Sequence, residues 1–292
     1  MKLESGKIYM RLLGGLGNQL FQFASGYGIA QKVGADLVLD LSAMANYKTW
    51  EFGLDLFNLP DNVEIAHIDT RQSNKLLGTL TKHLNKSSIA KEYSHSFCQE
   101  LFEITPPTYL KGYFQSPLYF QDCEKEIRKF LRPVKELTTK NEERLKLIKS
   151  SKHAVSLHVR RGDYLKSKES AAVHGVLGKP YYDAALEIFE KLYGDDFRIF
   201  LFSDDPTWAE ETFSNYPKVD ASGDRDAVAW EDLHLMSKCQ HNIIANSTFS
   251  WWSAWLNGNK NKTVIAPRHW FGREKHRQNP SFDMFPIGWI TI

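Results

Sequence analysis

Residues 153–164 of this chain read HAVSLHVRRGDY, an apolar run that ends in two arginines, a glycine and an aspartate. Apolar residues fill both alternations of its first half, as expected for a strand that helices cover on both faces of a sheet. The same pattern recurs in RIFLF at 198–202 and HNIIA at 241–245. The stretch therefore predicts the first strand of a buried parallel sheet, with polar groups at its carboxyl end.

Strand and helix patterns alternate outward from this strand toward the end of the chain. We predict further strands at 198–203, 241–245 and 262–266, and helices at 181–192, 206–214, 226–238 and 250–257. Such alternation indicates an α/β domain of the Rossmann type. Ligands of these sheets bind beyond the carboxyl ends of the strands, so the residues that follow each strand are the candidates for function.

The first half of the chain shows a related pattern. We predict strands at 7–13, 35–40 and 108–114 and helices at 18–33, 117–131 and 137–149, with irregular structure at 41–106. A chain of 292 residues is long enough for two cores. We predict domains at 1–150 and 151–292, joined by the lysine-rich segment 146–152.

Composition excludes several classes of function. The 37 basic and 35 acidic residues give a net charge of +2, too small for bulk attraction to nucleic acid, so no nucleic-acid partner is expected. The three cysteines lack the spacing of a disulfide framework or a zinc site. The first ten residues lack the apolar core of a signal peptide, and a cytoplasmic location is expected.

Arg160 and Arg161 follow the strand where its sheet is expected to open to ligand. A guanidinium group is a rigid fork that matches phosphate oxygens and can stabilise the charge on a departing diphosphate. Side chains alternate along a strand, so we assign the phosphate to Arg160, on the face of His158. Arg161 and Asp163 share the other face and either pair within the loop, which we favour, or leave Asp163 as a catalytic base.

Polar residues also follow the next predicted strand, which ends at Ser203. Asp205 suits a helix N-cap and Pro206 the first helical position. Asp204 is then left for the base or ribose of a nucleotide, or is an ordinary turn residue.

The third strand end carries NSTFSWW at 246–252. The hydroxyls of Ser247 and Thr248, with the free backbone N–H groups of a helix start, suit phosphate. The alternative is that its serines only cap the helix. The tryptophans at 251 and 255 recur at helical spacing, and we assign them to the core.

The stretch GGLGNQ at 14–19 forms a glycine turn in the first half. It lacks the third glycine of a dinucleotide fingerprint and the lysine of a P-loop, which argues against nicotinamide or ATP. Backbone at Gly15 and Gly17 can approach a ligand closely, and the amides of Asn18 or Gln19 can bind sugar or phosphate. A simple tight turn is the alternative.

The pair Asp224 and Asp226 has the Asp-x-Asp spacing that holds a metal in some sugar transferases. Asp226 also suits the N-cap of the helix predicted from 227. We therefore predict no catalytic metal and no cofactor.

Four motifs in this order resemble the bacterial alpha-1,2-fucosyltransferases, which belong to glycosyltransferase family 11. The motifs are GGLGNQLFQFA at 14–24, HVRRGDY at 158–164, FSDD at 202–205 and NSTFSWWSAWL at 246–256. The resemblance implies a GT-B fold, with two Rossmann-like domains facing across a cleft and GDP-fucose bound by the C-terminal one. The segment 41–106 carries no recognised motif and is expected to help choose the acceptor.

The resemblance also assigns roles. It places Arg160 on the donor diphosphate, His158 beside it and Asn18 at the reacting centre. Further substrate contacts are expected from Asp204, Ser247, Thr248, Phe249, Gly15, Gly17, Gln19 and Asp163. No residue is assigned as the general base, because related enzymes often lack an obvious one.

The implied reaction is metal-independent, inverting transfer of L-fucose from GDP-β-L-fucose to the 2-hydroxyl of a terminal galactose. The expected partners are GDP-fucose and a galactoside acceptor, and a lipid-linked acceptor would bring peripheral contact with a membrane. One alternative is a GT-B glycosyltransferase with another nucleotide-sugar donor, because the arginine recognises diphosphate rather than sugar. A second is a non-catalytic carbohydrate-binding protein, suggested by eight tryptophans.

Overall fold

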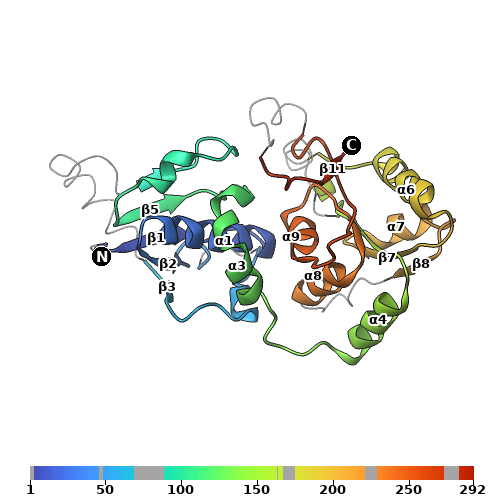
Figure 1. Ribbon diagram of the computed structural model, residues 1–292, viewed down its shortest axis with the longest axis horizontal. Helices are drawn as coiled ribbons and strands as arrows, with labels where there is room; N and C mark the ends of the chain where they lie inside the picture. The colour runs from blue at the N-terminus through green and yellow to red at the C-terminus, as the bar shows by residue number, and fades with distance from the viewer. Residues whose placement is uncertain are drawn as a thin grey trace. The chain divides into compact units, whose positions relative to one another are not determined.

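The computed structural model describes residues 3–45, 49–68, 89–162, 164–166, 175–220, 229–272 and 283–292 (Figure 1). The chain divides into two compact units. Unit 1 comprises Met1–Val134 and Phe282–Phe285, and unit 2 comprises Lys135–Ser281 and Pro286–Ile292. Each unit is built on its own parallel sheet.

Unit 1 has a five-stranded sheet in the order β3-β2-β1-β5-β4. Its strands are β1 (Lys7–Arg11), β2 (Asp36–Asp40), β3 (Val63–Ala66), β4 (Ile89–Lys91) and β5 (Thr108–Lys111). The helix α1 (Leu16–Lys32) packs on β1 and β2 (Figure 1). The short helices among its described residues are η1 (Leu54–Leu56), η2 (Gln99–Phe102), η3 (Pro117–Tyr119), η4 (Gln121–Cys123) and α3 (Glu124–Phe130).

The strands predicted at 7–13, 35–40 and 108–114 are confirmed, but the prediction of irregular structure at 41–106 is wrong at two places. The missed strands β3 and β4 are the two edges of the sheet. Ile65 in β3 is 45 % exposed, so this strand lacks the continuous apolar run that marks a buried one. The helix predicted at 117–131 is instead the series η3, η4 and α3, whose junction at Phe120 leaves helical geometry.

Unit 2 has a six-stranded sheet in the order β11-β10-β9-β6-β7-β8. Its strands are β6 (Ala154–Val159), β7 (Arg198–Ser203), β8 (Lys218–Asp220), β9 (His241–Ile243), β10 (Val264–Ala266) and β11 (Ile290–Thr291). Its helices are α4 (Thr139–Ser150), η5 (Tyr164–Lys166), α6 (Lys179–Tyr193), α7 (Pro206–Thr212), α8 (Ala229–Lys238) and α9 (Thr248–Leu256). The chain builds outward from β6 to one edge and then from β9 to the other, which is the doubly wound arrangement. The predicted alternation is confirmed.

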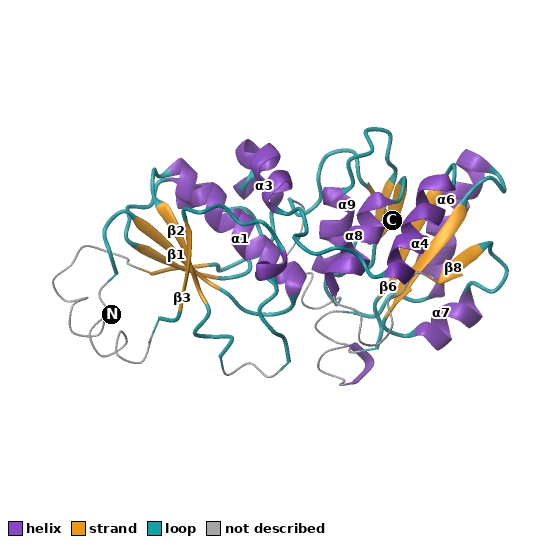
Figure 2. Cartoon of the chain, turned by 90° about the horizontal axis from the view of Figure 1, so that it is seen from below, coloured by secondary structure: helices purple, strands orange, loops and turns teal. Residues whose placement is uncertain are grey.

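Helices cover both faces of this sheet (Figure 2). Val155 and Leu157 of β6 lie in one core cluster with Tyr182 and Phe189 of α6. The opposite face of the sheet, with Phe200 of β7, packs against α4 and α8. This explains why the strands are apolar on both alternations. The tryptophans assigned to the core are buried, with Trp251 and Trp252 at 0 % exposure and Trp255 at 6 %.

The boundary between the units lies at Val134, not at the predicted residue 150. The segment predicted as a linker is the end of α4, which packs into unit 2 through the buried Ile148. Asn141 of α4 also donates to the carboxylate of Glu231 in α8. Lys146 and Lys149, which suggested a linker, lie on the solvent-facing side of this packed helix, and Lys152 follows its end.

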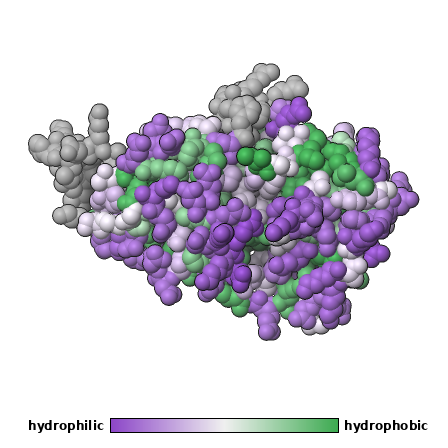
Figure 3. Space-filling model, in the orientation of Figure 1, coloured by the Kyte–Doolittle hydropathy of each residue, from purple (hydrophilic) through white to green (hydrophobic). Residues whose placement is uncertain are grey.

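The face of the molecule in Figure 3 is mostly hydrophilic, with apolar residues in small separate groups. No described helix has the length and apolar character needed to cross a bilayer.

Candidate active site

The strand order of unit 2 reverses between β6 and β9, which makes the carboxyl ends of these strands the place where such sheets bind ligands. The loop after β6 carries Arg160 and Arg161, and the loop after β9 leads into α9 at Thr248. Tyr164 joins the two loops, because its hydroxyl donates a hydrogen bond of 3.1 Å to the backbone oxygen of Asn246. Two motifs that lie some eighty residues apart in sequence therefore meet at the carboxyl ends of β6 and β9.

Arg160 stands at this edge between a carboxylate and an aromatic ring. Its Nε lies 3.3 Å from Oδ2 of Asp204, and its Cζ lies 5.9 Å from the ring centroid of Tyr164. The side chains of Arg160 and Asp204 are 21 % and 24 % exposed. A cation this far removed from water interacts more strongly with an approaching anion than a surface arginine does.

Asp204, predicted to be left for a ligand, is engaged by its own unit. One oxygen accepts a hydrogen bond of 2.8 Å from the backbone N–H of Arg161, and the other faces Arg160. Burial raises the pKa of this carboxyl, but the guanidinium of Arg160 and the N–H groups of Arg161 and Gly162 hold it below its ordinary value. Asp204 is therefore ionised at neutral pH and holds Arg160 in place. A Cβ on Gly162 would lie 2.7 Å from the backbone oxygen of Asp204, so only glycine allows this close approach.

The side chain of Arg161 points away from that of Arg160, to the other face of the strand, as the alternation of side chains along a strand predicts. Its Nε lies 3.6 Å from Oδ2 of Asp205, and its Cζ lies 4.1 Å from the ring centroid of Trp208. The expected partner Asp163 lies outside the described residues. Asp205 is the N-cap of α7 and Pro206 begins it, as predicted. Arg161 thus fastens the loop to α7.

His158 lies beneath the site in β6 and is 5 % exposed. Burial, and then the charge of Arg160, lower its pKa to about 3, against a smaller opposing effect of Asp204. The imidazole is therefore neutral at physiological pH. Its ring centroid is 5.9 Å from that of Phe249, and its Nδ1 meets no hydrogen-bond partner within the described chain.

The helix α9 begins directly beside this loop. Ser247 is its N-cap residue, but the Ser247 side chain makes no capping hydrogen bond. The hydroxyl of Ser250 bonds to the backbone oxygens of Ala245 and Ser247. The alternative that these serines serve only as side-chain caps is therefore not supported. Thr248 is the first helical residue, and Phe249 packs against the core of unit 2.

In unit 1 the strand order reverses between β1 and β5. Gly14 follows β1 with a φ of +90°, and Gly15 is the N-cap of α1. Oδ1 of Asn18 accepts a hydrogen bond of 3.0 Å from Nε2 of Gln115, which lies beyond the end of β5. Gly17 is buried inside the first turn of α1.

Gln19, predicted to contact substrate, is committed to its own unit. Its Nε2 donates to the backbone oxygens of Gly14 and Glu51, and its Oε1 accepts from the backbone N–H of Gly53. The side chain has 0 % exposure, so the amide holds the glycine loop against residues 51–53. Its predicted contact with substrate stays a prediction.

The family model for glycosyl transferase family 11 matches residues 2–292. This chain belongs to glycosyl transferase family 11. It is 33 % identical over 291 residues to the O-antigen biosynthesis glycosyltransferase WbnK of Escherichia coli, covering 90 % of this chain and 95 % of the relative. It is 31 % identical over 301 residues to an alpha-1,2-colitosyltransferase of Escherichia coli, covering 98 % of each.

More distant similarities agree with these. The galactoside 2-alpha-L-fucosyltransferase Sec1 of Mus musculus is 24 % identical over 87 % of this chain and 66 % of its own length. The solved structure of NodZ alpha-1,6-fucosyltransferase soaked with GDP-fucose matches 87 % of this chain and 93 % of NodZ, with a TM-score of 0.51 and 18 % identity. The fold is therefore GT-B, and this family 11 protein is a glycosyltransferase.

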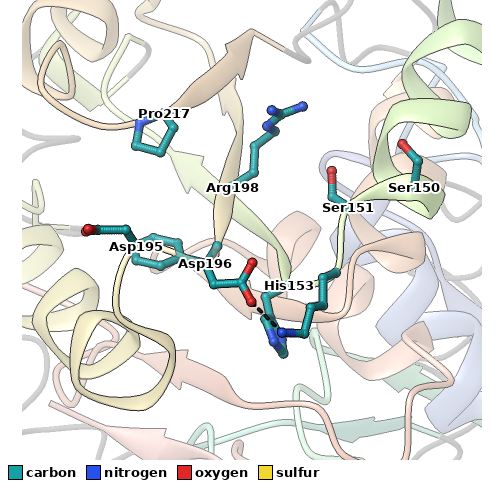
Figure 4. Close-up of a pocket in the computed structure, with 9 residues that line it drawn as sticks. Ser150, Ser151, His153, Asp195, Asp196, Arg198 and Pro217 are labelled. Carbon is teal, nitrogen blue, oxygen red and sulfur yellow. Dashed lines mark hydrogen bonds and ion pairs between the residues drawn. The ribbon is translucent and has the colours of Figure 1, made fainter.

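A surface pocket of about 250 Å³ lies at the amino ends of the strands of unit 2, opposite the candidate site (Figure 4). It is lined by His153, just before β6, by Arg198, the first residue of β7, and by the ion pair of Lys152 with Asp196. These are the amino ends of the strands, where doubly wound sheets do not bind their ligands. We assign this pocket no role in the family 11 reaction.

The described residues hold no cluster of three or more His, Cys, Asp or Glu side chains that could bind a metal ion. Asp224 and Asp226 belong to 221–228, outside the described part of the chain. Gln115 was missed in the sequence, although it follows a predicted strand, and strand ends are where functional residues of this fold collect.

Proposed function

We propose that this glycosyltransferase transfers L-fucose from GDP-β-L-fucose to the 2-hydroxyl of a terminal galactose in an oligosaccharide or surface-polysaccharide precursor. The observation that carries the donor half is Arg160, a partly buried cation held by Asp204 at the edge between β6 and β9. The galactose acceptor and the 2-position rest on the four-motif resemblance and on the names of the relatives.

In the proposed reaction, the bond between C1 of fucose and the β-phosphate oxygen breaks, and its electron pair stays on the departing GDP. The acceptor oxygen attacks C1 from the opposite face, which inverts the configuration. Its proton passes to water, because no side chain is assigned as the general base. Arg160 offsets the charge that grows on the phosphate, and the backbone N–H groups of the first turn of α9 add to this through the helix dipole. His158 is neutral, so Arg160 rather than the imidazole supplies the positive charge at this position.

The donor sugar has a second candidate, because the alpha-1,2-colitosyltransferase resembles this chain over its full length. A guanidinium recognises the diphosphate of either nucleotide sugar, so the residues around Arg160 do not choose between the sugars. A GDP-linked deoxysugar other than fucose is therefore the alternative that an observation favours. Membership of a glycosyltransferase family argues against a non-catalytic binding protein.

The test is release of GDP from GDP-fucose and, in parallel, from GDP-colitose, with and without lactose. Each reaction is run with excess EDTA and again with added Mn²⁺. We expect lactose-dependent release from GDP-fucose that EDTA does not change, and a product with an alpha-1,2 linkage. Faster release of GDP from GDP-colitose than from GDP-fucose would show that colitose, not fucose, is the donor sugar. A rate that EDTA abolishes and only Mn²⁺ restores would overturn the proposed metal independence.

We also propose a cytoplasmic site of action, with membrane contact supplied by a lipid-linked acceptor. Fractionation of cells with and without that acceptor tests this, since the protein should move to the membrane fraction only when the acceptor is present.

A further inference from the structure

Three buried glutamines lie around the carboxyl ends of β1 and β5, where the strand order of unit 1 reverses. Gln19, Gln22 and Gln115 are 0 %, 1 % and 5 % exposed. Gln19 bonds three backbone groups, as described above, and Gln22 accepts from the backbone N–H of Leu13 and donates to the backbone oxygen of Gly112. The first two amides therefore hold backbone together, which is the usual work of a buried glutamine.

Gln115 differs from both. Its Nε2 donates to a side chain, Oδ1 of Asn18, at 3.0 Å. Its Oε1 is buried and meets no donor among the described residues. A buried acceptor without a donor destabilises the folded state, and an apolar side chain of similar size would avoid this cost. What glutamine provides here, and an apolar side chain could not, is the hydrogen bond from its amide to Asn18.

The backbone around Gln115 is held without its side chain. The carboxylate of Glu92 accepts hydrogen bonds from the backbone N–H groups of Tyr113 and Phe114, at 2.7 and 2.9 Å. The hydroxyl of Ser25 donates to the backbone oxygen of Phe114 at 2.8 Å. These bonds fix a loop in which Phe114 has a φ of +51°. The Gln115 amide is therefore presented by the loop rather than needed to form it.

We propose that Gln115 is a positioning residue for Asn18 on the acceptor side of the reaction. The bond to Oδ1 fixes the rotation of the Asn18 amide and directs its Nδ2 over Gly14, where an added Cβ would lie only 2.6 Å from that nitrogen. A defined amide direction lowers the entropy lost when a sugar hydroxyl is bound and oriented. This inference rests on the proposed function and on the place at the reacting centre that the family resemblance predicts for Asn18.

A double-mutant cycle tests the inference, using the donor and acceptor that the wild-type enzyme accepts. We expect N18A to lower kcat the most, Q115A to lower it about tenfold without changing the donor KM, and N18A/Q115A to be no slower than N18A. Additive losses would show that Gln115 acts apart from Asn18 and would overturn the inference. Full turnover by N18A would overturn it too. A wild type without transfer would instead count against the proposed function.

Two further variants separate positioning from support of the loop. In Q115E an ionised carboxylate cannot donate to Asn18, whereas the protonated form can, so the activity of Q115E relative to wild type should rise as the pH falls. A ratio independent of pH contradicts the inference. S25A removes a bond to the same loop but leaves the contact with Asn18, and we expect a lower Tm with a kcat near that of wild type. Equal kinetic losses in S25A and Q115A would make the effect one of loop stability.

Discussion

The two sheets of this glycosyltransferase share one architecture. They present different chemistry at the carboxyl ends of their strands, at the point where the strand order reverses. In unit 2 the edge between β6 and β9 carries Arg160 and Asp204, a charged pair that is partly removed from water. In unit 1 the edge between β1 and β5 carries Asn18 and Gln115, two neutral amides. A diphosphate needs a cation, whereas a neutral sugar is bound by groups that donate and accept hydrogen bonds.

The two sites also differ in how they control the charge of a carboxyl group. Asp204 stays ionised because Arg160 and backbone N–H groups stabilise its charged form. Glu92, near the other edge, accepts two backbone hydrogen bonds, yet burial raises its pKa to about 7. The two carboxyl groups therefore differ in charge near neutral pH: Asp204 is ionised, whereas Glu92 takes up a proton near pH 7.

The largest expected effect comes from removing the cation. R160A should lower kcat about 10²- to 10³-fold, because one preorganised charged donor is lost from the transition state. R160K, which keeps the charge but not the fork, should retain part of the activity. Steady-state kinetics with GDP-fucose and calorimetry with GDP measure both variants.

The matched control is R198A, which removes an exposed arginine at the amino end of β7. Its kcat and its affinity for GDP should stay near those of wild type. Equal losses in R160A and R198A would mean that net charge, rather than position at the carboxyl edge, supports the reaction.

The second effect concerns the pH dependence of stability. The folded pKa of Glu92, about 7, lies above its ordinary value of 4.5, so the folded state binds the proton more tightly. Its contribution to the free energy of unfolding should therefore fall as the pH rises from about 4.5 to about 7, by at most about 3 kcal/mol.

The variant E92Q lacks this titration. The difference in unfolding free energy between wild type and E92Q should change across that pH interval and stay constant above it. Denaturant unfolding at pH 5, 6, 7 and 8 measures the difference, and parallel pH curves would exclude a raised pKa at this site.

A smaller effect is expected from G14A. The new Cβ would lie 2.6 Å from Nδ2 of Asn18, at a φ of +90°. The amide must move, so kcat should fall about 10- to 30-fold while the affinity for GDP stays unchanged. Gly34 offers a control, because it has a φ of +65° and nothing within 4 Å of an added Cβ. G34A should lose only about 1 kcal/mol of stability to strain. Equal kcat values in G14A and G34A would show that the position of the Asn18 amide does not affect turnover.

The smallest effect is expected from R161A. This guanidinium lies on Trp208 and near Asp205, so its loss should lower stability by about 1 kcal/mol and kcat by only a few fold. Thermal unfolding and kinetics measure the two. A loss of kcat as large as that of R160A would show that both arginines meet the diphosphate.

Much of unit 2 and its candidate site could be predicted from the sequence. Apolar runs mark strands that are buried on both faces, and residues after such strands come together because parallel strands end at one edge. Arg160, Asp205 as an N-cap and the buried tryptophans follow from neighbours a few positions away. The family and its GT-B fold follow from the four motifs.

Other features depended on contacts that sequence spacing does not reveal. The backbone bond to Asp204 joins residues 43 positions apart, and the bond of Gln115 to Asn18 joins residues 97 apart. The edge strands β3 and β4, the boundary at Val134 and the use of Gln19 within the loop likewise rest on packing against distant segments. Local patterns record which face of an element is apolar, but which polar groups pair is decided only when the sheets bring distant loops together.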